Sequence, residues 1–216
     1  STITGLTSST NYFAKSFIVN KAGTSYGTVV SFTTTTPPPV LGASYGGGNV
    51  AHIFTSGDPG YVAGEYHGII ISSVWMNDGV GTSWSSNLTQ TNATSLIYGG
   101  GLTNTNTIYS LLGTNAYAVN LCKTYSVTQN GITYSDWVLP SLNELLRIAT
   151  NLTGNGFGTI WTSNRCSNCN WSWSSSELAS SSTDVQVMDN GNLGTFGLIK
   201  SESGGNRVIV RAIRYF

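Results

Sequence analysis

The chain has 216 residues, of which only 8% are charged, and its nine basic and nine acidic residues cancel to a formal net charge of zero. This balance excludes the basic surface that attracts nucleic acid, and no apolar run approaches the roughly 20 residues of a membrane-spanning helix. Serine, threonine, asparagine and glycine surround six tryptophans and eleven tyrosines, a composition that favours an extracellular, β-rich protein.

The N-terminal residues 1–34 alternate apolar and polar side chains between short turns, which predicts half-buried antiparallel strands. We expect strands over residues 1–6, 12–20 and 28–34. The spacing of Leu6, Thr10, Tyr12, Asn20, Gly23, Gly27 and Phe32 resembles the last strands of a fibronectin type III domain. Three strands leave one face of a sandwich uncovered, so further N-terminal domains of a longer chain are expected to precede this partial, all-β sandwich.

A linker of threonine and proline follows over residues 35–40. Its three consecutive prolines, Pro37, Pro38 and Pro39, favour a stiff polyproline spacer. The predicted organisation is therefore a partial fibronectin-like domain in 1–34, the linker in 35–40 and a larger domain in 41–216.

The larger domain is predicted to begin with strands and continue with helices. Residues 50–54 and 68–74 have strand composition and are separated by a Gly-Asp-Pro-Gly turn at 57–60. Residues 104–112 and 116–125 have the apolar spacing of helices.

A helix start is predicted most clearly after Pro140, where Ser141 and Glu144 form a capping-box pair. Leu142, Leu145, Leu146 and Ala149 then fall on one helical face. After Gly156 we expect only strands and turns, ending in the alternating run 207–216. Helices followed by strands predict an α+β domain.

The three cysteines and two histidines offer little chemistry. Cys166 and Cys169 form a C-S-N-C unit that is expected to close a local disulfide, in preference to half of a zinc site or a redox pair, whereas Cys122 is expected to be a buried thiol. His52 and His67 are expected to be structural, although Glu65 could approach His67. No catalytic residue and no metal ligand is predicted, and the chain is not expected to be an enzyme.

Four colinear segments resemble a known family. They are residues 41–51 (LGASYGGGNVA), 57–70 (GDPGYVAGEYHGII), 134–145 (YSDWVLPSLNEL) and 210–216 (VRAIRYF). Together they are similar to the Lcl C-terminal domain family, named for a bacterial collagen-like adhesin. The resemblance implies a C-type-lectin-like fold, related to the variable proteins of diversity-generating retroelements and to formylglycine-generating enzymes, and it implies display at the bacterial cell surface.

In that fold the last strands and loops present the binding face. The segment 173–177 (WSSSE) and the turn 189–192 (DNGN) resemble the family's frame around this face. The resemblance then implies that the ligand-binding residues are Trp171, Trp173, Ser180, Ser181, Asp184, Gln186, Leu193, Thr195, Phe196, Leu198, Ser201, Glu202 and Asn206. Phe196 and Leu198 could instead complete the core of a hairpin.

The expected function is an adhesin or receptor-binding module for a host-cell or environmental glycan or protein. A structural subunit of a surface stalk or filament, with oligomers, is the alternative. The cysteine pair Cys166 and Cys169 invites comparison with the copper-binding cysteines of formylglycine-generating enzymes, but the spacing does not match. No organic cofactor is expected; calcium is possible through Asp58, Asp78, Asp184 and Asp189, although the sugar-binding triplets of true C-type lectins are missing.

Overall fold

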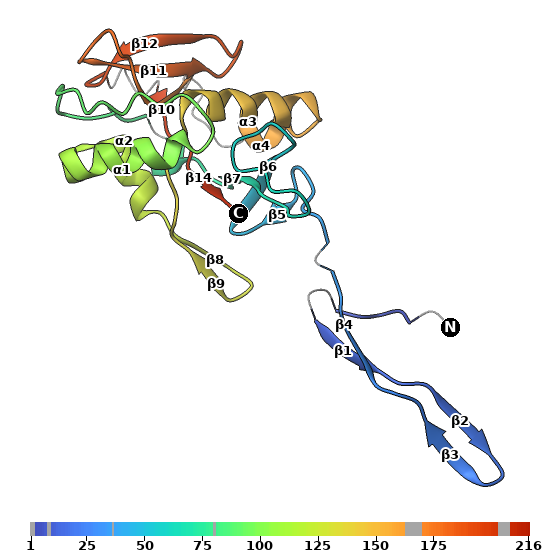
Figure 1. The fold of residues 1–216 in the computed structure, drawn as a ribbon. Coiled ribbons are helices and arrows are strands. Elements are labelled where there is room, and N and C mark those ends of the chain that lie inside the picture. The colour runs from blue at the N-terminus through green and yellow to red at the C-terminus, as the bar shows by residue number, and fades with distance from the viewer. Residues whose placement is uncertain (1–2, 8–9, 36, 80, 163–169, 203–207) are drawn as a thin grey trace. The chain divides into compact units, whose positions relative to one another are not determined.

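The computed structural model of the chain describes residues 3–7, 10–35, 37–79, 81–162, 170–202 and 208–216 (Figure 1). It is 22% helix and 30% strand, which confirms the predicted α+β class. The chain divides into two compact units, Ser1–Pro38 and Pro39–Phe216. Within the described residues, no helix has both the length and the apolar character needed to cross a membrane.

The first unit is a long, interrupted β-hairpin. Its strands are β1 (Asn11–Ala14), β2 (Phe17–Asn20), β3 (Gly23–Tyr26) and β4 (Val30–Thr33). β1 pairs antiparallel with β4, and β2 pairs antiparallel with β3 across the Asn-Lys-Ala-Gly turn.

Two strand predictions in this unit are wrong in detail. Residues 3–7 form no strand, and the single strand expected over 12–20 is divided into β1 and β2. The division arises because residues 15–16 on one side face 27–29 on the other. One side therefore has an extra residue, which interrupts the ladder as a β-bulge does.

The second unit contains a four-stranded sheet of order β14-β7-β6-β5, in which all neighbouring strands are antiparallel. The strands are β5 (Ser44–Tyr45), β6 (Gly48–Ile53), β7 (Gly68–Ser72) and β14 (Ile213–Tyr215). Strands β6 and β7 confirm the two predicted strands to within two residues at each end. The final strand β14 pairs with β7, so segments far apart in sequence share this sheet.

A second four-stranded sheet has the order β12-β11-β10-β13, with β10 and β13 parallel and the other pairs antiparallel. Its strands are β10 (Trp171–Glu177), β11 (Asp184–Asp189), β12 (Thr195–Ile199) and β13 (Val208–Ile209). β12 is an edge strand (Figure 1). A small hairpin of β8 (Val127–Gln129) and β9 (Ile132–Tyr134) was not predicted.

The helices are α1 (Gly100–Leu112), α2 (Tyr117–Thr124), α3 (Leu142–Gly154) and α4 (Gly158–Thr162), with 3₁₀ turns η1 (Met76–Gly79) and η2 (Gly113–Asn115). The first three confirm the predicted helices. The expectation of only strands after Gly156 is wrong, because α4 forms there. Tertiary packing outweighs the local pattern, since Trp161 of α4 is fully buried edge-on against Trp75.

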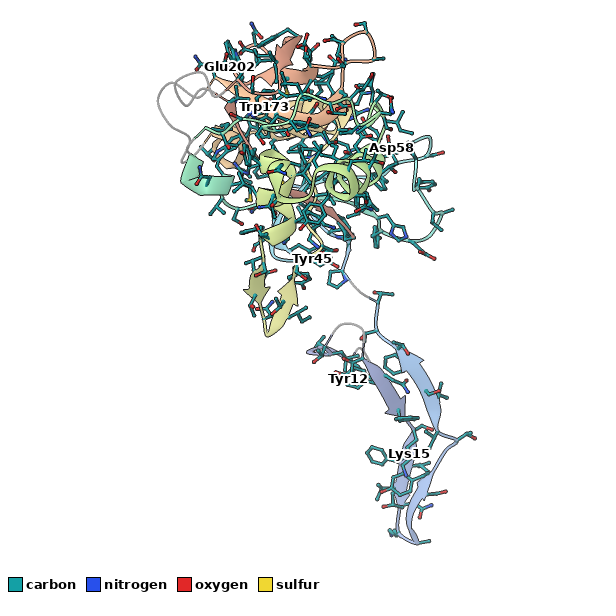
Figure 2. All side chains as sticks on the ribbon, turned by 90° about the vertical axis from the view of Figure 1, so that its left-hand side faces the viewer. Tyr12, Lys15, Tyr45, Asp58, Trp173 and Glu202 are labelled. Carbon is teal, nitrogen blue, oxygen red and sulfur yellow. The ribbon has the colours of Figure 1, made fainter. Side chains whose placement is uncertain are left out.

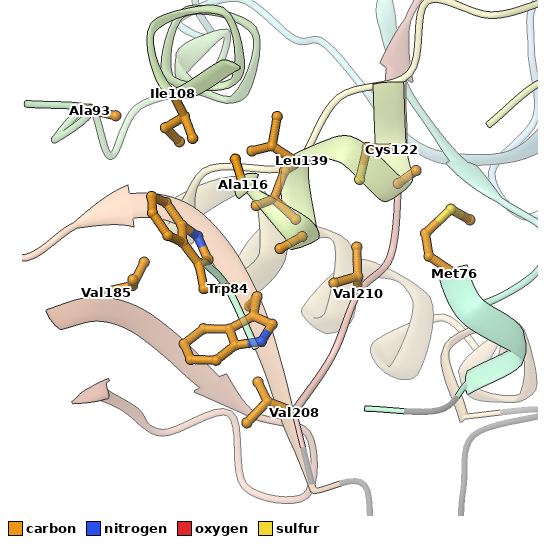
Figure 3. Packing of buried hydrophobic residues seen from close by; sticks show 14 of the residues in the cluster. Met76, Trp84, Ala93, Ile108, Ala116, Cys122, Leu139, Val185, Val208 and Val210 are labelled. Atoms are coloured by element: carbon orange, nitrogen blue, oxygen red, sulfur yellow. The ribbon is translucent and has the colours of Figure 1, made fainter. Parts of the chain in front are cut away.

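Tryptophan dominates the core of the second unit. Five of the six tryptophans are no more than 2% exposed, and only Trp171 is half-buried. One cluster joins α1 and α2 to the second sheet around Trp84 (Figure 3). A second cluster joins α3 to both sheets around Trp161. These large rings therefore hold the two sheets and the helices together, and they are not available to a ligand.

Candidate functional site

The predicted binding residues divide between the two faces of the β10–β12 part of the second sheet. Alternate residues of a strand point to opposite faces. Val185 faces Leu198, and Val187 faces both Phe196 and Trp173, in the register of β10, β11 and β12. These side chains all pack on the core around Trp84. The core-facing side thus includes several residues that were predicted to touch ligand.

Trp173, which is labelled in Figure 2, is fully buried, so its assignment to the binding face is wrong. Its indole nitrogen donates to the carbonyl oxygen of Thr82 at 2.7 Å, which leaves no polar group for a ligand. Trp171, Phe196 and Leu198 are half-buried on the same side, and the Trp171 and Phe196 rings meet edge to face at 5.1 Å. The hairpin-core interpretation of Phe196 and Leu198 agrees with this packing.

The opposite face of β11 and β12 carries the remaining predicted strand residues. Asp184 and Gln186 are half-buried and Thr195 is exposed. Asp184 is paired with Ile199, whose side chain is 39% exposed and was not predicted. We call Asp184, Gln186, Thr195 and Ile199 the outward face.

The loops beside the outward face contain the other predicted residues. Ser180 and Ser201 are exposed, whereas Ser181 and Glu202 are half-buried. Leu193 is half-buried against the α3 cluster, so it contributes to the core as well as to the turn. Asn206, Cys166 and Cys169 lie outside the described residues, as do the disulfide, zinc and redox interpretations that depend on the two cysteines.

Beneath these loops lies a buried ion pair that the sequence did not reveal. Lys200 Nζ lies 2.5 Å from Glu177 Oε1, and both side chains are fully buried. The ammonium group also donates to the carbonyl oxygens of Thr89 and Ser182, each at 2.8 Å, and sits 5.2 Å from the centre of the Trp84 ring. All three ammonium protons therefore have an acceptor.

Glu177 completes the arrangement by accepting from the backbone nitrogen of Thr91 with both carboxylate oxygens, at 3.0 and 2.9 Å. The backbone of Lys200 accepts from Trp84 and Ser85 as well. The pair thus joins the loop before α1, the turn between β10 and β11 and the end of β12. A charged pair in this position fixes the loops that flank the outward face.

Both histidines have structural partners. His52 Nδ1 lies 2.9 Å from Asn151 Nδ2, which also donates to the carbonyl oxygen of Ala51, so this ring nitrogen is the acceptor. His52 Nε2 then donates to Asp58 at 3.1 Å. His67 binds Glu65 at 2.8 Å and the Phe216 carbonyl oxygen at 3.1 Å, as the predicted approach of Glu65 requires.

These environments move the two histidine pKa values in opposite directions. Burial lowers the pKa of His52, aided by the positive charge of Arg147 and opposed by Asp58. The hydrogen bond to Glu65 raises the pKa of His67. In a proton NMR titration we expect one imidazole to titrate below about pH 6.5 and the other above it. Asn151→Ala should shift the lower titration alone.

The sign of the stability effect follows from these directions. His52 binds protons more weakly in the folded state, so its contribution is complete above the unfolded pKa and declines as the pH falls towards the folded value. His67 binds protons more tightly when folded, so its contribution is complete at low pH and is lost as the pH rises through its folded pKa. If both histidines titrated at the same pH, the lowered pKa of His52 and the raised pKa of His67 would both be contradicted.

The described carboxylates and thiol have ordinary structural roles. Asp58 accepts from the Thr55 backbone and hydroxyl, and Asp189 accepts from the amides of Gly191 and Asn192 in its own turn. Throughout the described ranges, no three His, Cys, Asp or Glu residues gather in a group that could hold a metal ion. Cys122 is fully buried, as predicted, and burial raises the pKa of its thiol.

Comparison with known proteins does not assign the chain to a family. No protein-family model matches the chain, and no curated protein matches it either.

Proposed function

We propose that the chain is a ligand-binding module displayed at the bacterial cell surface, in which a C-type-lectin-like domain follows the last strands of a fibronectin type III domain. The observation that supports binding is the outward face, which is partly exposed at Thr195 and Ile199 and lies on a rigid base. Phe196 and Leu198 anchor β12 to the core from one side, and Lys200 anchors its end. Asp184, Gln186 and Thr195 then offer polar groups beside the apolar Ile199.

A preformed surface of this kind suits recognition of a glycan or of a protein, because little conformational freedom is lost on binding. A binding role also agrees with the histidines, whose ring nitrogens are occupied by structural partners. The four segments shared with the Lcl C-terminal domain family support the same proposal.

The test is a glycan array combined with a pull-down against surface proteins, followed by variants of the captured interaction. Thr195→Arg with Ile199→Arg should reduce binding at least about tenfold, since two long cations block the outward face, and it should leave the melting temperature unchanged. Leu111→Arg on α1 is the matched control, because Leu111 is 64% exposed on a different element. Binding that survives the double substitution would refute the assignment of the face.

Phe196→Ser separates packing from recognition. This substitution removes a core-anchoring ring and is expected to lower the melting temperature. If the Phe196→Ser variant is stable but has lost binding, Phe196 contacts the ligand instead of anchoring the core.

A structural role in a stalk or filament is the second candidate, and one observation favours it. The first unit exposes large apolar side chains along its strands, with Phe13, Phe17, Ile18 and Val30 between 61 and 71% exposed. Such surface is normally covered by a partner. Concentration-dependent oligomers in sedimentation velocity, together with no captured ligand, would favour this role over binding.

A further inference from the structure

Two hollows share Tyr98 as a lining residue, and no residue of the outward face lines either of them. The polar hollow, of about 280 Å³, is lined by Tyr98, Asn143, Leu146, Arg147 and Thr150. The aromatic hollow, of about 350 Å³, is lined by Tyr98 together with Phe54, Pro59, His67, Tyr215 and Phe216 among others. We call the two hollows together the Tyr98 cleft.

The polar hollow is formed by one face of α3. Asn143, Arg147 and Thr150 lie three to four residues apart along the helix, so their side chains project in the same direction. Arg147 Nε donates to the Tyr98 hydroxyl. Among the described residues, the side-chain amide of Asn143, the hydroxyl of Thr150 and the outer guanidinium nitrogens of Arg147 make no hydrogen bond, whereas the backbone N–H of Asn143 donates to the Leu96 carbonyl oxygen. These side-chain groups therefore remain available to a ligand.

The aromatic hollow is rigid because its rings are held from behind. The Tyr215 hydroxyl donates to the buried Glu144 carboxylate at 2.6 Å, and the His67 ring is fixed by Glu65 and by the Phe216 carbonyl. Tyr45 packs edge-on against Phe216 at 5.3 Å. A hollow whose walls are preorganised in this way loses little entropy when it binds a ligand.

The charges around the cleft are mixed. Arg147 is the cation of the polar hollow, and it interacts electrostatically with Asp58, while the exposed carboxylate of Glu65 lies beside His67. An anionic ligand would therefore be attracted by Arg147 but repelled by the carboxylates of Asp58 and Glu65. The cleft is suited to a neutral ligand that has one apolar side and several hydroxyl groups.

We propose that the Tyr98 cleft binds a neutral pyranose sugar. The C–H face of the ring would stack on the aromatic side of the cleft. The hydroxyl groups would bond to Asn143 and Thr150, which can donate and accept, and to Arg147, which donates only. This site shares no residue with the outward face. Sugar binding in the cleft can therefore be tested independently of the proposed function.

The test is saturation-transfer NMR on the intact chain with the methyl glycosides of glucose, galactose and mannose, and with glucuronic acid as the anionic comparison. We expect saturation of the ring C–H protons of at least one neutral glycoside. Tyr98→Ala should weaken that ligand about tenfold, and Asn143→Ala with Thr150→Ala should do the same without affecting folding, because both side chains are exposed. Tyr117→Ala, on a half-exposed tyrosine of α2, is the control.

Three results of the measurements with sugars would overturn the proposal. They are no saturation of any neutral glycoside, saturation unchanged in both cleft variants, and a preference for glucuronic acid that disappears in Arg147→Gln. A peptide captured by the chain and released by Tyr98→Ala, with no glycoside bound, would also overturn it. The variant that combines Thr195→Arg with Ile199→Arg should leave the glycoside signal intact. A failure of the proposed binding at the outward face can therefore be distinguished from a failure of the proposed sugar binding in the Tyr98 cleft.

Discussion

Lys200→Met is expected to destabilise the second unit by about 3–5 kcal/mol, because it leaves the carboxylate of Glu177 buried without its cation. Methionine keeps an unbranched apolar side chain only one atom shorter than that of lysine, so lost packing contributes little. The carbonyl oxygens of Thr89 and Ser182 lose their donor at the same time. The measurement is urea unfolding followed by the fluorescence of the buried tryptophans.

The double variant Lys200→Met with Glu177→Met isolates the uncompensated charge. Removing both charges should make the protein more stable than Lys200→Met alone, since a buried apolar pair avoids the desolvation of a lone carboxylate. Asp136→Asn is the control at the pair between Asp136 and Arg214, whose carboxylate side chain is 59% exposed. It should cost no more than about 1 kcal/mol. A Lys200→Met variant as stable as Asp136→Asn would show that the pair is not buried in solution.

The alternation of side chains along β11 and β12 distinguishes the core-facing side of this strand pair from the outward face. Val185, Val187, Phe196 and Leu198 are apolar at every second position, which is the pattern of a core-facing strand surface. Applying this period to β10 as well would have put Trp173 in the core. The resemblance alone placed both faces of the hairpin in the binding site, because a family's variable region is a stretch of sequence and not a surface.

Local signals predicted the three longer helices α1, α2 and α3, whereas α4 and the long-range polar contacts could not be predicted. The Ser141 and Glu144 spacing predicted a capping box, which the structure contains, with Glu144 accepting from the Ser141 amide at 2.7 Å. Nothing local pairs Lys200 with Glu177, because they are brought together by the turn and register of three strands. The Tyr98 cleft likewise depends on how α3 meets the loop before α1.

Glu144 illustrates how a local motif acquires a tertiary role. Its fully buried carboxylate accepts from the amides of Gly99, Gly101 and Ser141 and from the Tyr215 hydroxyl. Gly101 is required by this approach, since a Cβ there would lie 2.5 Å from Glu144 Oε2. Burial and the adjacent carboxylate both raise the pKa of Tyr215, so its hydroxyl remains a donor. One side chain therefore fixes the start of α1, the start of α3 and the last strand.

Glu144→Gln is consequently expected to destabilise the protein by about 2–5 kcal/mol, although it changes only one atom of the side chain. An amide has one acceptor oxygen, so two of the four donors lose their partner and face an N–H group instead. Tyr215→Phe removes a single donor and should cost about 1.5 kcal/mol. Urea unfolding gives both values, and hydrogen exchange at Gly99, Gly101 and Ser141 should accelerate in Glu144→Gln.

Equal stability of Glu144→Gln and Tyr215→Phe would contradict the four-donor arrangement. It would mean that only the hydrogen bond from the Tyr215 hydroxyl contributes to the free energy of unfolding. The same comparison bears on the Tyr98 cleft, which Gly99 and Tyr215 both line. Tyr215→Phe retains the ring that forms the wall and loses only its anchor to Glu144. If that anchor preorganises the cleft, glycoside affinity should fall in Tyr215→Phe through a faster dissociation rate while the set of saturated sugar protons stays the same.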